Sequence, residues 1–63
     1  MPLISVTHAS AISDEQARKL IRSLTEAYAT TTGANPTSIQ VLITNVPADR
    51  WGIGGQTLTQ RKR

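Results

Sequence analysis

The sequence predicts an α/β fold of the α+β kind, in which a β-α-β unit is followed by a C-terminal hairpin. Three observations support this prediction. Two β-prone runs, 3–8 and 39–46, flank one long amphipathic segment, and a glycine-rich stretch at 52–55 follows the second run. Because the chain has only 63 residues, we expect a single domain over 1–63.

The first strand is expected at residues 3–8, LISVTH. The period of two assigns alternate side chains to opposite faces: Ile4, Val6 and His8 to one, and Leu3, Ser5 and Thr7 to the other. His8 is the only histidine of the chain. A lone histidine on a strand more often makes a structural hydrogen bond than acts as an acid or a base.

The segment SDEQ, which starts at Ser13, predicts the beginning of a helix. The Ser13 side chain can accept from the Gln16 N–H while the Gln16 side chain accepts from the Ser13 N–H, which is a capping box. Gly33 suits the left-handed position after the last turn, and Asn35-Pro36 prevents the helix from continuing. Between these ends one apolar stripe recurs at helical spacing: Ala17, Leu20, Ile21, Leu24, Ala27, Tyr28 and Thr31.

The second strand is expected at 39–46, IQVLITNV, with apolar side chains on both faces. Such a strand is usually covered from both sides. Strand, helix and strand then form a unit whose strands run parallel and whose crossover is right-handed. One helix covers only one face of a two-stranded sheet, so we expect chains to pair into four-stranded sheets within an oligomer.

After Pro47 the stretch ADRWGIGGQ predicts a tight hairpin, because Asp49 favours a turn and three glycines permit it. A nucleotide-binding loop is disfavoured, since the Walker lysine is missing and no helix is expected to follow. Trp51, the only tryptophan, suggests a ring held against a neighbouring subunit or a ligand. The polar tail, 56–63, is expected to lie along another subunit or to fray.

Composition disfavours several classes of protein. Without cysteine there are no disulfides and no thiolate metal sites, and one histidine with four scattered carboxylates offers no metal-ligand cluster. No apolar run approaches the ~20 residues that span a bilayer, so we expect no membrane span and place the protein in the cytoplasm. The net charge of +3 is concentrated in the C-terminal RKR, but the stacking aromatics of a nucleic-acid binder are scarce. Nucleic acid is therefore disfavoured as a partner.

Pro2 leaves two interpretations open. If Met1 is removed, Pro2 carries a free secondary amine; the reference pKa of an α-amino group is about 8 and falls on desolvation. Such an amine can lift a proton from an enol hydroxyl and return it to carbon. If Met1 stays, the nitrogen is an amide without a basic lone pair, and Pro2 merely begins an edge strand.

Together, MPLISV, SDEQARKLI, the apolar 39–46 strand and the RWGIGG hairpin resemble the 4-oxalocrotonate tautomerase family over essentially the whole chain. The resemblance implies a β-α-β protomer that pairs into a four-stranded sheet, with three such dimers forming a hexamer. It also implies that the N-terminal proline, here Pro2, is a general base or acid in the keto–enol isomerisation of 2-oxo acids. No cofactor is expected. A homo-hexamer is expected first, and a hetero-hexamer stays open because some relatives combine two types of chain.

Two positions depart from the family's pattern. Characterised members carry arginines that hold the substrate carboxylates, and this chain has Ile12 and Gln40 there. Neither side chain substitutes for a guanidinium. Trp51 matches the family's hairpin aromatic and is expected to form an apolar wall over Pro2. Ile53 stands where relatives that activate water carry an acid, so water activation is disfavoured.

Two functions follow. The first is a proline-dependent tautomerase acting on a small or apolar enol of a 2-oxo acid, for example an aryl enol bound against Ile12 and Trp51, and weak on dicarboxylates such as 2-hydroxymuconate. Ser38 and Ile53 complete the expected substrate site. Lys62 could add one positive charge from a neighbouring subunit, although a solubilising tail is the simpler interpretation. The alternative is a catalytically silent or auxiliary subunit of a hetero-hexamer.

Overall fold

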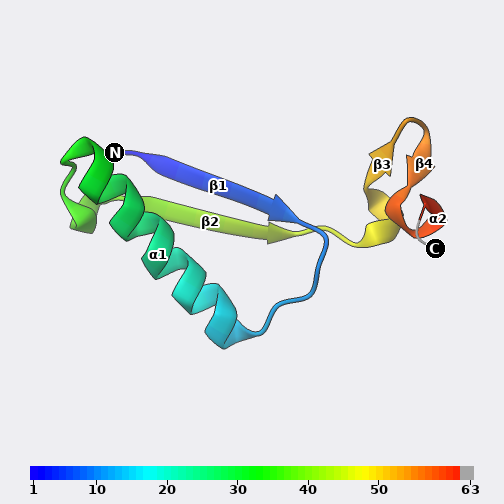
Figure 1. Cartoon of the computed structure of the whole chain (residues 1–63), viewed down its shortest axis with the longest axis horizontal. Helices are drawn as coiled ribbons and strands as arrows, with labels where there is room; N and C mark the ends of the chain where they lie inside the picture. The colour runs from blue at the N-terminus through cyan, green and yellow to red at the C-terminus, as the bar shows by residue number, and fades with distance from the viewer. Residues whose placement is uncertain (62–63) are drawn as a thin grey trace.

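The computed structural model describes residues 1–61 and confirms the predicted fold class (Figure 1). Strand β1, Leu3–His8, leads through a loop into helix α1, Asp14–Thr32, which runs back along the sheet towards the start of strand β2, Gln40–Asn45. The two strands are parallel neighbours and pair along their whole length, as expected of a β-α-β unit.

Strand β2 begins one residue later and ends one residue earlier than the predicted 39–46. At its start the Ile39 N–H donates to the first carbonyl of the 3₁₀ turn Pro36–Ser38 (3.2 Å) and is not available to the sheet. The Gln40 N–H donates instead across the sheet to the Pro2 carbonyl (2.9 Å). The start of β2 therefore holds Pro2 in place.

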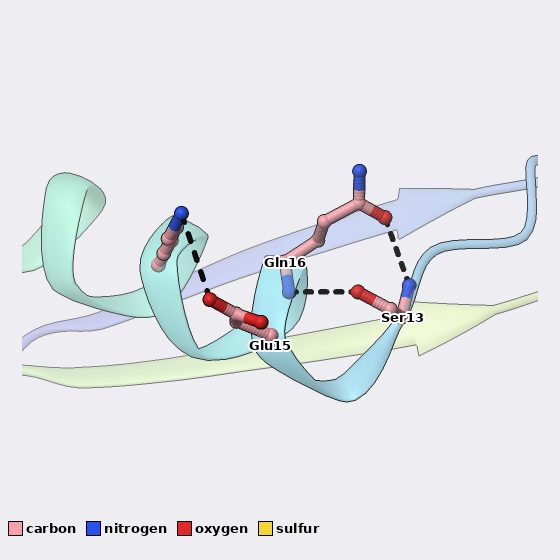
Figure 2. Close-up of polar contacts among 4 residues, drawn as sticks. Ser13, Glu15 and Gln16 are labelled. Carbon is pink, nitrogen blue, oxygen red and sulfur yellow. Dashed lines mark hydrogen bonds and ion pairs between the residues drawn. The ribbon is translucent and has the colours of Figure 1, made fainter.

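Both ends of α1 are formed as predicted. Figure 2 shows the capping box, in which the Gln16 N–H donates to Ser13 Oγ (3.1 Å) and the Ser13 N–H donates to Gln16 Oε1 (2.9 Å). At the other end Gly33 adopts φ 79°, and its N–H closes the last turn (2.8 Å). Glu15 lies 3.8 Å from Lys19 Nζ, but an exposed pair of this kind adds only a few tenths of a kcal/mol.

The capping box leads to a first prediction. We expect Ser13→Ala to lower the free energy of unfolding by about 1 kcal/mol, because helix N–H donors lose their partners. Ser10→Ala is the matched control: it removes a hydroxyl from an exposed loop position without a side-chain hydrogen bond within residues 1–61. Thermal unfolding followed by circular dichroism, at one fixed chain concentration, compares the two. Equal stabilities of the two variants would contradict the role of the cap.

The sheet is covered on one face only (Figure 1). The other face carries Leu3 and Leu42, 59% and 54% exposed, among short polar side chains. As expected, the single helix covers one face of β2, and the cover expected for the other face from a second chain stays a prediction. The half-buried side chains on the helix-covered face are Ile4, Val6, His8, Val41 and Ile43.

The apolar stripe of α1 is narrower than predicted. Ile21 is 40% exposed, and Ala27 and Thr31 are exposed as well. Two strands about 5 Å apart form a narrow sheet, so a helix of about 10 Å diameter overhangs it and the edges of its stripe stay in solvent. The stripe residues that are half-buried are Ala17, Leu20, Leu24 and Tyr28.

No residue among 1–61 is fully buried, so this part of the chain has no core of its own. The radius of gyration is 14.8 Å, whereas a compact domain of this length has about 11 Å. The chain exposes 4986 Å², whereas a monomeric globular protein of the same mass exposes about 4,000 Å². Within residues 1–61 the fold therefore leaves exposed much of the apolar surface that a compact domain of this size would bury.

An arm, residues 47–61, projects past the end of the sheet (Figure 1). Its hairpin is antiparallel, as predicted, and Gly54 and Gly55 adopt φ 60° and 88°. A two-residue turn of type I′ requires positive φ at both positions, which glycine adopts without strain. The elements of the arm are a 3₁₀ turn at Ala48–Arg50, strands β3 (Gly52–Ile53) and β4 (Gln56–Thr57), and helix α2 (Leu58–Arg61).

Helix α2 shows that the expectation of no helix after the hairpin was wrong. Thr57 and Gln60 form a second capping box: the Gln60 N–H donates to Thr57 Oγ1 (3.1 Å), and the Thr57 N–H donates to Gln60 Oε1 (2.8 Å). The spacing that predicts this box, TLTQ, is present in the sequence. Within the same described range, no helix combines the length and apolar character needed to cross a membrane.

Candidate active site

Pro2 lies at the start of β1 and is half-buried. Its carbonyl accepts the Gln40 N–H (2.9 Å), which fixes the residue against β2. On its other side Met1 is 92% exposed. Removing Met1 would therefore take away little packing and leave the Pro2 nitrogen at the end of a held strand.

Of the expected site residues, Gln40 lies beside Pro2, and Ser38 lies in the turn just before β2. Gln40 is exposed on the open face of the sheet, opposite Leu3 in the strand register. Ser38 is half-buried, and its hydroxyl donates to the Asn35 carbonyl (2.9 Å) within the turn that precedes β2. The Ser38 proton is thus committed, which leaves its oxygen as an acceptor, whereas the Gln40 carboxamide offers both donor and acceptor atoms.

Ile12 does not lie near this pair within one chain. It is 36% exposed in the loop before α1, while β2 begins near the opposite end of that helix (Figure 1). A helix of the length of α1 spans about 28 Å. Ile12 and Gln40 of the same chain therefore cannot contact one small substrate together.

Trp51 and Ile53 lie in the arm, at the far end of the molecule from Pro2 (Figure 1). The six residues of β2, which separate the two places, span about 20 Å. Trp51 is half-buried within the arm, where its carbonyl accepts the Leu58 N–H (2.9 Å), and Ile53 is 45% exposed. A wall of Trp51 over Pro2, as the sequence predicts, would have to come from another chain.

The described lysines and arginines lie on α1 and in the arm, outside the parallel sheet that begins at Pro2. Neither strand of the parallel sheet nor the turn before β2 carries a lysine or an arginine. In that same part of the chain, no group of three or more His, Cys, Asp or Glu side chains gathers into a possible metal site. Lys62, the expected source of one positive charge, lies outside the described residues. The described basic residues are Arg18, Lys19, Arg22, Arg50 and Arg61.

The comparisons with known proteins agree with two features of the structure: a half-buried proline begins a β-α-β unit, and an arm projects past the end of the sheet. A family model described as "Tautomerase enzyme" matches residues 2–61. The chain belongs to the 4-oxalocrotonate tautomerase family. This tautomerase is 39% identical over 57 residues to the 2-hydroxymuconate tautomerase of Stutzerimonas stutzeri, with 90% of each chain covered.

Two solved structures extend the comparison. TomN, a 4-oxalocrotonate tautomerase homologue in the tomaymycin biosynthetic pathway, aligns with a TM-score of 0.90 and 31% identity over 97% of this chain and 94% of its own. The heterohexamer 4-oxalocrotonate tautomerase of Chloroflexus aurantiacus aligns with a TM-score of 0.86 and 28% identity over 95% and 97%. The tautomerase described here is accordingly an enzyme of the isomerase class.

Proposed function

We propose that this tautomerase moves a proton between the oxygen and the carbon of a 2-oxo acid enol, with the amine of Pro2 as base and then as acid. The observation that carries the proposal is the state of Pro2: its carbonyl is held by the Gln40 N–H (2.9 Å), while its nitrogen bears only the exposed Met1. Removal of Met1 turns that nitrogen into a secondary amine at a fixed place.

The proton balance of the reaction is simple. The neutral amine accepts the proton of the enol hydroxyl, and the enolate oxygen becomes the carbonyl oxygen as the electrons of the double bond take up a proton at carbon. The same nitrogen, now protonated, supplies that proton and returns to its neutral form. An α-amine with a reference pKa of about 8 can fill both roles near neutral pH, and an amide can fill neither.

Several chains are needed to build the site. The open sheet face and the absence of any fully buried residue among 1–61 support association, and the separation of Trp51 from Pro2 requires that a second chain close the site. We infer four-stranded sheets assembled into a hexamer of identical chains, with a hexamer of two chain types as the variant to test. If the arm of one chain packs over Pro2 of another chain, the exposed side chain of Ile53 is covered as well.

The substrate is inferred to be small or apolar with a single carboxylate. Ile12 and Gln40 provide no guanidinium for a second carboxylate, and Trp51 with Ile53 offers apolar contact for an aryl group. The dicarboxylate 2-hydroxymuconate is expected to be a poor substrate for the same reason.

One experiment tests the proposal. Intact mass spectrometry reports whether Met1 is removed, and ultraviolet absorbance follows the decay of the phenylpyruvate enol and of 2-hydroxymuconate with the same sample. We expect a chain that has lost Met1 to act on the aryl enol and weakly or not at all on the dicarboxylate. A chain that keeps Met1 and still turns over either enol would overturn the role of Pro2.

A second function, an auxiliary subunit of a hetero-hexamer, is favoured by the same two departures, Ile12 and Gln40. It predicts no turnover by the isolated chain on either enol and the appearance of activity when a related chain with both arginines is mixed in. Turnover by the isolated chain after Met1 removal would dismiss it.

A further inference from the structure

We propose that Arg50 of one chain binds the substrate carboxylate at Pro2 of another chain. The inference rests on the proposed function, because it needs a 2-oxo acid at Pro2 and the arm of a second chain beside it. It assigns a role to Arg50, which opens the RWGIGG stretch and stands directly before Trp51 in the arm.

The start of the sheet lacks a partner for a carboxylate. A 2-oxo acid is an anion near neutral pH, and a charge that leaves water needs a counter-charge or strong donors. The described residues that adjoin Pro2 along the chain and across the sheet, Leu3 and Gln40, are neutral. We therefore look for the cation in the arm of another chain.

Arg50 combines a held backbone with an available head group. Its N–H donates to the Pro47 carbonyl (2.9 Å), which fixes the residue in the 3₁₀ turn Ala48–Arg50. Its side chain is exposed, and its one hydrogen bond within residues 1–61 is a long contact of 3.5 Å from Nη1 to the carbonyl of the preceding Asp49. The Asp49 carboxylate forms no ion pair with it in that part of the chain. The guanidinium can thus exchange a weak contact for a bidentate carboxylate.

The position beside Trp51 distinguishes Arg50 from the other described cations. Neighbouring Cα atoms are about 3.8 Å apart, so a surface that packs against Trp51 lies within the length of the Arg50 side chain. Lys19 already pairs with Glu15 (3.8 Å), and Arg18 and Arg22 lie on α1. The competitor within the arm is Arg61, at the end of α2.

The experiment compares Arg50→Gln with Arg61→Gln on two probes, the enol of phenylpyruvate and the enol of its neutral methyl ester. We expect Arg50→Gln to raise KM for the acid by about 10- to 100-fold with a smaller change in kcat, because a charge-assisted hydrogen bond is lost. The ester should be turned over at the unmodified rate. Arg61→Gln should leave both probes within about twofold, and Arg50→Lys should recover part of the affinity for the acid.

Three outcomes decide against Arg50. They are an unchanged KM for the acid in Arg50→Gln, an equal loss on acid and ester, or a loss in Arg61→Gln alone. Mass measurement of the assembly by analytical ultracentrifugation shows whether a loss instead reflects dissociation, which would also reject a specific role.

Failure of the proposed function gives a different result. If the unmodified chain turns over neither enol, calorimetric titration with phenylpyruvate still tests Arg50. If phenylpyruvate binds tightly and Arg50→Gln weakens that binding at least tenfold, the carboxylate site at Arg50 is retained and the catalytic role of Pro2 is rejected. No binding by the unmodified chain rejects both.

Discussion

The Pro2→Ala variant is expected to lose about 100-fold or more in kcat/KM toward the enol of an aryl 2-oxo acid, because a positioned base contributes about 10²- to 10⁴-fold. Alanine keeps the carbonyl that accepts the Gln40 N–H (2.9 Å), so the pairing of β1 with β2 is retained. What changes is the nitrogen: the proline ring fixes φ and holds a secondary amine, whereas alanine presents a primary amine on a freely rotating bond.

Two controls make the Pro2→Ala result specific. Pro36→Ala changes an exposed proline away from the N-terminus but keeps its carbonyl in the turn before β2, and should leave kcat/KM unchanged. A synthetic chain that retains Met1 has the native side chain at Pro2 and only an amide nitrogen, so it should be inactive. Wild-type rates in Pro2→Ala, or activity with Met1 in place, would show that another group is the base.

Features that depend on neighbours in the sequence could be predicted well. The capping box of α1 needs only Ser13 and Gln16, and the end of the helix needs only a glycine in the left-handed region, here Gly33. Thr57 and Gln60 have the same capping-box spacing, which predicts the start of α2. Local capping and strand alternation are properties of short segments, so they are readable without the rest of the molecule.

Features that depend on other chains could not be predicted from one sequence by physical reasoning alone. The apolar side chain of Leu42 predicts a covered strand face, yet within residues 1–61 that face is open, and Leu42 is 54% exposed. Trp51 suggests an aromatic ring that packs against a neighbouring subunit or a ligand. Which surface the ring contacts depends on how the arms and sheets of separate chains would pack together. The candidate site residues can therefore be named one by one from the sequence, whereas their arrangement depends on the proposed assembly.

Ile12 and Gln40 stand where characterised members of the family carry arginines. We expect the double variant, Ile12→Arg with Gln40→Arg, to raise kcat/KM for 2-hydroxymuconate by about 10-fold per arginine. Each charge-assisted, bidentate contact to a carboxylate contributes about 1.5–3 kcal/mol, and a factor of ten corresponds to about 1.4 kcal/mol. The fold accommodates both changes, since Ile12 is 36% exposed, Gln40 is exposed, and the Gln40 N–H bond to the Pro2 carbonyl involves only backbone atoms.

The gain should also reveal which chains supply the two arginines. Because α1, which is about 28 Å long, runs from the loop of Ile12 towards the start of β2, we do not expect a single chain to clamp one dicarboxylate with both. An assembly re-formed from a mixture of the two single variants should therefore recover part of the gain of the double variant. The lysine pair, Ile12→Lys with Gln40→Lys, should gain less because an ammonium cannot bind a carboxylate through two parallel hydrogen bonds. A folded, assembled double variant with no gain on the dicarboxylate, as measured by its ultraviolet decay, would mean that these two positions do not face the substrate.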